Sequence, residues 1–402
     1  MHNFGTLYRY ELGKILRKKI VWITIAVVLL AIFLSGGMRL LGDYYVDGVK
    51  VDTHFHMFQV DAAYQKELDG RAIDQSLLEE MQEGYGKIPV DAERYTLTEE
   101  YQTYARPYSV ISNFVRSSTG MNLSDIRQWE PDEQELYRLK QLVLEKEWDS
   151  YYLTQKEKDF WRNQEESLER PIVFRYKEGW WNLFDCMYTI GILSLIVVSI
   201  CLASVFTEEH SRKTDQLILC SRYGRKTVYW AKFLAGVFFS FLMCLLFIGA
   251  VFIEAFVLYG SEGFTAAFQL IDPVYSYPLS VGEAVLISYG IIIAAVVVTG
   301  AFVMMLSELI RSNIGTLSVV VGMVLLTAFI DMPEQYRVLS QLWSYLPSEY
   351  AAVWNIYSPQ TVPLFGKILL SWQVVPVLYL VCAGVFAMIG KKSFTGYQVS
   401  GR

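Results

Sequence analysis

The side chains that most often carry out catalysis or bind metals are few and widely spaced in this chain. Its 402 residues include only four histidines and five cysteines. The cysteines form no CxxC pair and no Cys/His pattern of the kind that holds zinc. His54 and His56 flank Phe55 and could place two imidazoles on one strand face, although two solvated loop histidines are the simpler interpretation. We therefore predict no metal site.

Motifs for hydrolysis or nucleotide binding are absent as well. A phosphate-binding loop needs GxxxxGK followed by Ser or Thr, and the nearest stretch, 384–393, has one residue too many between its glycines. Neither HExxH nor GxSxG occurs. We expect no catalytic residue and no cofactor bound by this chain.

Four carboxylates lie near the ends of long apolar segments, namely Asp185, Glu254, Glu308 and Asp331. Ionisable residues inside a membrane are costly and usually functional. Glu254 is the deepest candidate because the apolar stretch AFVLYG follows it. It is our candidate substrate or gate residue, with a carboxylate that reaches the interface as the simpler alternative. The lack of other charges favours a large, amphipathic passenger over an ion.

Six charge-free windows of 19 to 24 residues define the elements that must position these groups. About 20 apolar residues suffice for a helix to cross a membrane. The windows predict an all-α membrane protein with six transmembrane helices and exclude a soluble enzyme, a β-barrel and a disordered chain. The first window follows nineteen residues and has no A-x-A-like cleavage site, so we interpret it as a retained anchor. The windows are 20–38, 186–207, 233–253, 284–307, 312–330 and 368–390.

The distribution of Lys and Arg predicts the orientation. The segments predicted on the same side of the membrane as the two termini hold fifteen Lys and Arg residues in total. The two loops predicted on the opposite side, 254–283 and 331–367, hold two. Basic residues favour the cytoplasmic side, so both termini should be cytoplasmic and the long segment 42–183 extracellular. We expect a multi-pass protein of a bacterial cell membrane, in contact with lipid and with no nucleic-acid partner.

The predicted extracellular domain is acidic and mostly helical. Residues 40–183 carry 17 basic and 28 acidic side chains and no cysteine, so an ordinary core must stabilise the domain. Apolar residues recur among charges over 61–82 and over 132–169, which is typical of amphipathic helices. Two further segments should lie at the membrane surface: 1–19 as an interfacial elbow helix, and the proline-containing outer loop 331–367 as a re-entrant or interfacial pair of short helices. We predict an elbow helix at 1–19, a first transmembrane helix at 20–41, the extracellular domain at 42–183 and a second transmembrane helix at 184–207. A cytoplasmic coupling loop at 208–231, transmembrane helices three to six within 232–395 and a cytoplasmic tail at 396–402 follow.

The loop after the second predicted span could bind a soluble partner. The sequence 205–236 reads VFTEEHSRKTDQLILCSRYGRKTVYWAKFLAG. An amphipathic helix beneath the membrane would present its apolar run with charges at the rim, although an ordinary basic inner loop fits equally well.

This segment resembles the coupling loop of permease subunits of type-2 ABC exporters, which links the second and third spans. In both this segment and the family's loop, glutamate comes first, followed by a threonine, a run of apolar residues, and then Ser, Arg and Lys in that order. The chain departs from the family at Lys213, where Gly is frequent. The opening FGTLYRYELGKILRKK, 4–19, is similar to the family's elbow helix. The matching residues are Glu208, Glu209, Thr214, Leu217, Ile218, Leu219, Ser221, Arg225 and Lys232.

The resemblance implies a half-transporter that pairs with itself or a sister permease and with ABC ATPase subunits on separate chains. ATP and Mg would bind to those ATPases, and an amphipathic compound such as a lipid or a peptide antibiotic would move outward. The resemblance covers 1–40 and 180–395 but not the outer domain. Two alternatives stay open: a non-transporting receptor or scaffold whose outer domain senses a ligand, and a cation extruder, which the charge-free spans disfavour.

Overall fold

The computed structural model describes residues 2–38, 41, 44–46, 49–51, 53–90, 94–211, 214, 226–364 and 366–396. The chain forms two compact units. The helical unit comprises Met1–Ile32, Cys186–Phe252 and Ile287–Arg402. The second unit comprises Phe33–Asp185 and Ile253–Leu286, so it takes in a later segment in addition to the predicted outer domain.

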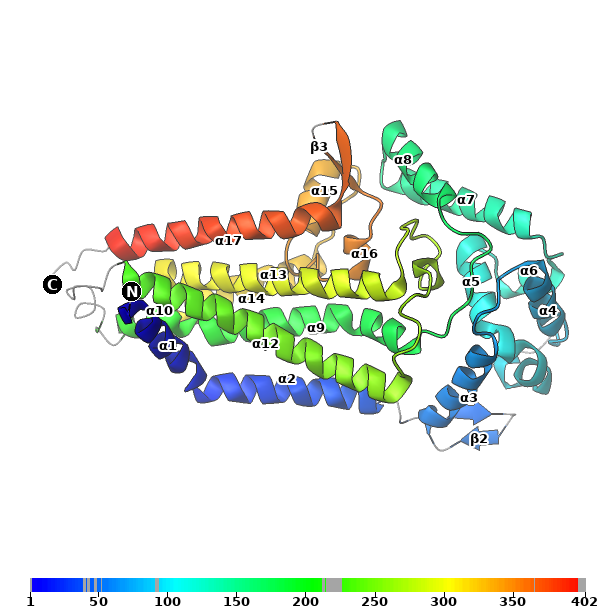
Figure 1. The fold of residues 1–402 in the computed structure, drawn as a ribbon, viewed down its shortest axis with the longest axis horizontal. Helices are drawn as coiled ribbons and strands as arrows, with labels where there is room; N and C mark the ends of the chain where they lie inside the picture. Colours follow the sequence, from blue (N-terminus) through cyan, green and yellow to red (C-terminus); the bar gives the residue numbers. More distant parts are fainter. Residues whose placement is uncertain are drawn as a thin grey trace. The chain divides into compact units, whose positions relative to one another are not determined.

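Five long apolar helices dominate the described chain, and each has the length and composition needed to cross a membrane. They coincide with five of the six charge-free windows (Figure 1). The second of them continues, after a break at Ala203, into a short helix, α10 (Ser204–Ser211). The five are α2 (Lys19–Met38), α9 (Glu178–Leu202) with α10, α12 (Thr227–Tyr259), α13 (Val281–Ile310) and α17 (Ser371–Gly396).

The remaining window, 312–330, forms the shorter apolar helix α14 (Asn313–Phe329). Arg311 adopts a left-handed conformation with φ 56° and separates α13 from α14. Ser312 then caps α14 by accepting a hydrogen bond from the backbone N–H of Gly315. With 17 residues, α14 is shorter than the other five helices, so a sixth span stays a prediction.

The predicted interfacial segments are helical, with one addition. Helix α1 (His2–Leu16) precedes α2, and the chain bends between them (Figure 1). The predicted outer loop contains two short helices, α15 (Arg337–Ser344) and α16 (Val353–Ile356). It also contains an antiparallel hairpin of β3 (Thr361–Leu364) and β4 (Lys367–Leu370), which the sequence analysis did not predict.

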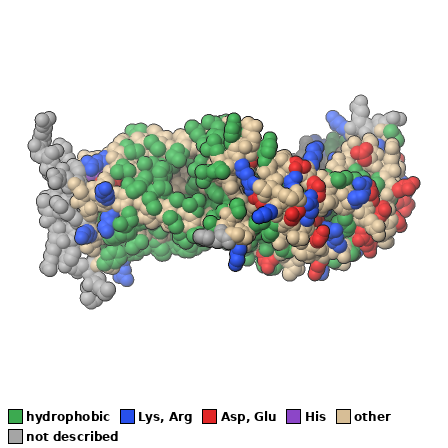
Figure 2. Space-filling model, turned by 90° about the horizontal axis from the view of Figure 1, so that it is seen from above, with side chains coloured by type: hydrophobic (Ala, Val, Ile, Leu, Met, Phe, Trp, Pro, Cys, Tyr) green, Lys and Arg blue, Asp and Glu red, His purple; other side chains and the backbone are tan. Residues whose placement is uncertain are grey.

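Apolar side chains cover much of the surface of the helical unit. Figure 2 shows hydrophobic side chains along its length and Lys and Arg side chains near one end. On α2, Ile23 and Val27 are more than half exposed, and on α17 Leu380 is 70% exposed. Such continuous apolar faces are typical of surfaces that meet lipid or other helices.

The second unit has a compact core of its own, formed by α4, α5, α6 and the start of α7 with residues 172–174. Its two predicted long helical stretches are each broken. The stretch 61–82 divides at Gly70, whose φ of 85° suits glycine, and 132–169 divides at Tyr152, with φ 53°. The hairpin of its first two strands was not predicted. The elements are β1 (Tyr44–Val46), β2 (Val49–Val51), α3 (His54–Glu67), α4 (Gln75–Gly86), η1 (Tyr95–Leu97), η2 (Tyr101–Ala105), η3 (Arg106–Tyr108), α5 (Ser109–Thr119), α6 (Leu123–Gln128), α7 (Glu133–Ser150), α8 (Gln155–Glu166) and η4 (Phe268–Leu270).

Candidate functional site: the charged network around α10

Helix α10 begins where a side chain from α13 is inserted beside the backbone. Ser307 is fully buried and donates its hydroxyl proton to the carbonyl of Ala203 at 2.7 Å. The same hydroxyl accepts a hydrogen bond from the backbone N–H of Phe206 at 3.3 Å. A side chain inserted in this way is a recognised cause of a helix break. Ser307 therefore fixes the point at which α9 ends and α10 starts.

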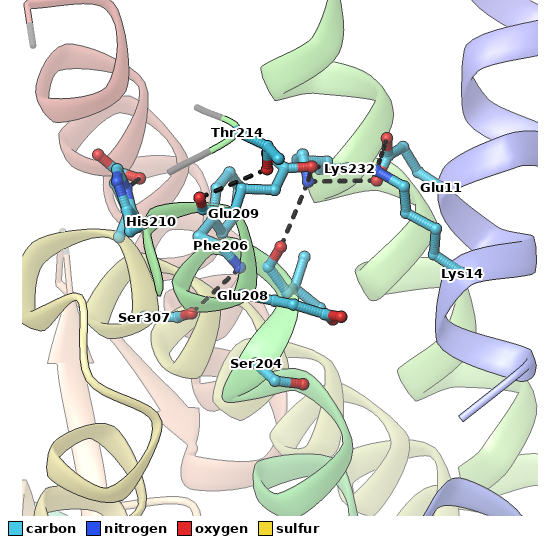
Figure 3. A network of polar contacts seen from close by, with 12 residues as sticks. Glu11, Lys14, Ser204, Phe206, Glu208, Glu209, His210, Thr214, Lys232 and Ser307 are labelled. Carbon is cyan, nitrogen blue, oxygen red and sulfur yellow. Dashed lines mark hydrogen bonds and ion pairs between the residues drawn. The ribbon is translucent and has the colours of Figure 1, made fainter. Parts of the chain in front are cut away.

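One flank of α10 carries a cluster of two lysines and two glutamates, all buried except the partly exposed Lys14 (Figure 3). The Lys232 ammonium, on α12, lies 2.7 Å from Glu209 Oε1 and 3.2 Å from Glu11 Oε2. Lys14 lies 2.8 Å from Glu11 Oε1 and 3.0 Å from Glu209 Oε1. Lys232 is 1% exposed. The four charges balance, so each buried ion has opposite charges within contact distance.

The same carboxylates affect the protonation of Lys14 on α1. Burial lowers the pKa of Lys14, but hydrogen bonds and charge interactions with Glu11 and Glu209 outweigh it and raise the pKa above its usual value. Lys14 therefore stays charged throughout the physiological pH range.

A second, more exposed pair joins α10 to Lys18, the residue before α2. Lys18 lies 2.8 Å from Glu208 Oε2 and donates a hydrogen bond to Ser204 Oγ at 2.7 Å. A cavity of 540 Å³ opens beside these residues, lined by parts of α1, α10 and α12. Tyr10, Arg17 and Thr214 also line it.

The opposite flank of α10 contacts a fully buried carboxylate on α13. His210 Nε2 lies 3.2 Å from Glu308 Oε2, and Ser393 of α17 donates a hydrogen bond to Glu308 Oε1 at 3.3 Å. The Arg311 guanidinium lies 4.0 Å from Glu308 Oε1. Polar contacts on its two flanks thus connect α10 directly to α1, α12 and α13, and through Glu308 to α17.

The comparison with known proteins identifies the family. The sequence model of the ABC-2 family transporter proteins matches residues 6–359, most of the chain. This protein is a member of the ABC-2 transporter family. No curated protein and no solved structure matches the chain. Members of this family are multi-pass membrane permeases, generally without catalytic activity, that associate with an ABC ATPase.

Four of the predicted coupling residues of this ABC-2 permease are described, and they lie together at the α10 network. Glu208, Glu209 and Lys232 form the ion pairs above, and the Thr214 backbone N–H donates to the Glu209 carbonyl at 3.0 Å. Leu217, Ile218, Leu219, Ser221 and Arg225 lie outside the described residues. The role of all nine stays a prediction, but the burial of Glu209 and Lys232 favours positioning over direct contact with a partner.

Sequence reasoning missed several residues of the network. Glu11 is the only acidic residue among the first nineteen, and its position three residues before Lys14 on one helix face was a usable signal. The pairing of His210 with Glu308 had no such signal, because 98 residues separate them in sequence. Glu308 had been noted only as a carboxylate near the end of a span.

The candidate gate residue, Glu254, lies elsewhere, in the second unit. Its side chain is half-buried and its carboxylate lies against Gly36, where any Cβ atom would clash with it. Glycine at position 36 therefore makes room for this carboxylate. The structure does not test a gating role. Among the described residues, no group of three or more His, Cys, Asp or Glu side chains is placed to hold a metal ion.

Proposed function

We propose that this ABC-2 permease is the membrane subunit of an ATP-driven exporter that moves an amphipathic compound outward. A separate ATPase chain, which binds ATP and Mg²⁺, would supply the energy. The permease would pair with itself or a sister permease, with α14 as the fifth of six spans and α1 as the interfacial elbow helix. The family supports the permease role, and the α10 network supports the coupling to an ATPase.

We infer the orientation from the basic residues that lie near this network. Helix α10 and α1 lie next to the segments that hold most of the Lys and Arg residues outside the second unit, which favours the cytoplasmic side for this end. The second unit would then be extracellular. An ATPase in the cytoplasm could reach residues 212–226 directly after α10.

The observation that carries the proposal is that polar side-chain contacts hold α10 from both flanks, ionic on the side of Lys232 and Lys14. Lys232 ties it to α12, Lys14 ties it to α1, and Glu308 ties it to α13. A force on the segment after Ser211 would therefore reach three other helices through short, directional contacts rather than through flexible chain. Such a connection is what an ATPase needs in order to move transmembrane helices.

The passenger is inferred from the composition of the spans. The charge-free windows offer no chain of ionisable residues for protons or metal ions. The exposed apolar faces of α2 and α17 would suit a partner permease, lipid and an amphipathic molecule that moves along their interface.

The docking part of the proposal is tested by changing the predicted apolar contact. Replacing Leu217 and Ile218 with Ser should abolish co-purification of the ATPase while leaving membrane insertion intact, because the change removes the apolar run proposed to dock the ATPase and keeps every transmembrane helix. The matched control replaces Val338 and Leu339 of α15, both more than half exposed, with Ser. ATPase binding equal in both double variants would refute docking at this loop.

The coupling part needs a different measurement. His210→Ala removes the contact with Glu308 on α13 without touching the apolar run. We expect the ATPase to bind this variant but its hydrolysis rate to respond less to association with the permease. If the permease instead purifies as a stable chain with no ATPase under every condition, the receptor or scaffold function would replace our proposal.

A further inference from the structure

The second unit contains a cavity of 340 Å³ that the transport proposal does not use. Its apolar wall includes Phe114 of α5 and Leu270 of η4. Phe174, which precedes α9, and Trp181, near the start of α9, complete that wall. Its volume is within the range of about 300–1,000 Å³ that is typical of small-molecule sites. The wall thus offers an aromatic and aliphatic surface to a ligand of limited size.

A buried ammonium group lines this cavity. Lys177 is 6% exposed, and its Nζ lies 5.2 Å from the centre of the Phe174 ring. Within the described residues, no hydrogen bond or ion pair to the Lys177 ammonium is found. Burial lowers its pKa, opposed by the charge of Glu178. An ammonium held in this way is destabilising until an anion contacts it.

A second polar atom in the cavity wall also lacks a partner. Gln65 on α3 is 7% exposed, and its Oε1 atom accepts no hydrogen bond from the residues that the structure describes. The nearby Asp61 carboxylate accepts from Arg106 at 2.8 Å and is thereby neutralised. A buried acceptor without a donor is rare in folded proteins and indicates a missing hydrogen-bond donor.

These groups together define the chemistry of a ligand. We infer that the cavity binds a carboxylate compound with a neighbouring amide N–H and an apolar group, such as the C-terminal residue of a peptide or an N-acyl amino acid. The carboxylate contacts Lys177, the N–H donates to Gln65 Oε1, and the apolar group packs on Phe114, Phe174 and Trp181. The half-buried Glu178 carboxylate at the rim disfavours ligands with additional negative charge.

The test uses the full-length permease in lipid nanodiscs and isothermal titration with N-acetylphenylalanine. Removing the carboxylate, in N-acetylphenylalaninamide, should weaken binding by about tenfold to a hundredfold, the value of a hydrogen bond to a charged group. Removing the N–H, in 3-phenylpropanoate, should weaken binding less. Equal affinity for the acid and the amide, or no binding of the acid at millimolar concentration, would overturn the inference.

Two variants assign the interaction to residues. Lys177→Met should abolish the preference for the acid, whereas Lys146→Met, at an exposed position on α7, should keep it. Gln65→Leu should abolish the preference for N-acetylphenylalanine over 3-phenylpropanoate. Because Lys177→Met removes a buried ammonium that no side chain in the described ranges pairs with, the ligand-free variant should be at least as stable as the wild type, and a large loss of stability would contradict our account. No arm of this test depends on transport or on an ATPase.

Discussion

The buried cluster on α10 makes a quantitative prediction for Lys232→Met. The substitution keeps the volume of the side chain but leaves Glu11 and Glu209 to share the single ammonium of Lys14. Lys232, Glu11 and Glu209 are each at most 9% exposed, so water screens the interactions among these three only weakly. Removing one partner of a buried ion pair costs about 3–5 kcal/mol, because the remaining charge is uncompensated. That cost corresponds to roughly two to four powers of ten in the unfolding equilibrium.

The assay is reversible unfolding in mixed micelles, monitored by tryptophan fluorescence. Lys367→Met on the exposed surface of β4 is the matched control and should change the free energy of unfolding by about 0.5 kcal/mol or less. The double variant Lys232→Met with Glu209→Gln restores neutrality and leaves the pair of Glu11 with Lys14 intact. It should therefore be more stable than Lys232→Met alone. A near-neutral effect of Lys232→Met, or strict additivity in the double variant, would refute the reasoning.

Three further predictions concern stability. Ser307→Ala removes both hydrogen bonds at the start of α10 and should cost about 1–3 kcal/mol in the same unfolding assay; an effect below about 0.5 kcal/mol would show that the hydroxyl does not define the helix break. Gly36→Ala should displace the Glu254 side chain, so Glu254→Ala should raise the melting temperature more in the Gly36→Ala background than in the wild type; an equal effect in both backgrounds would argue against a clash at this contact. Burial raises the pKa of Glu147 to about 7, so the folded second unit keeps this proton where the unfolded chain has lost it. Stability should therefore fall as the pH rises from about 4.5 to about 7, and Glu147→Gln should lessen that fall; an unchanged pH profile would contradict the shift.

The long helices could be predicted because one property, the absence of charge over at least 19 residues, determines them. Five windows form long apolar helices with ends close to the nearest charged residues. Window 312–330 illustrates the limit of this rule. It begins next to Arg311, whose left-handed conformation and the cap at Ser312 leave only 17 residues for α14. Hydropathy alone does not report such a turn.

The helix breaks in the second unit were harder to predict because their cause is local. A glycine inside a helical pattern does not always end the helix, yet Gly70 does so here with φ 85°. After Tyr152, Thr154 and Glu157 form a capping box that starts a new helix, and this Thr-x-x-Glu pattern was visible in the sequence. The β3–β4 hairpin contains Pro363, which sequence reasoning treats as a strand breaker outside edge strands.

The candidate site shows a different limit. The resemblance to a family brought Glu209 and Lys232 to attention as members of one segment, but it gave no reason for their being 2.7 Å apart. Glu11 contacts Lys232 on one flank of α10, and Glu308 contacts His210 on the other. Both glutamates come from parts of the sequence far from α10. Periodicity reports which face of a helix is apolar, but not which charge on another helix will meet it.

The charges around α10 have a meaning beyond stability. Well-packed apolar residues often stabilise a protein as much as a buried ion pair does, so ionic contacts here are better explained by the geometry that they specify. Lys232 and Lys14 both contact Glu209, so a displacement of α10 must either move α1 and α12 with it or separate buried opposite charges. Separation is costly, and concerted movement is therefore the cheaper response. We therefore expect α1 to be a moving part of the permease rather than a passive anchor. A disulfide that fixes the end of α1 to the start of α2 should accordingly slow transport while leaving ATPase binding unchanged.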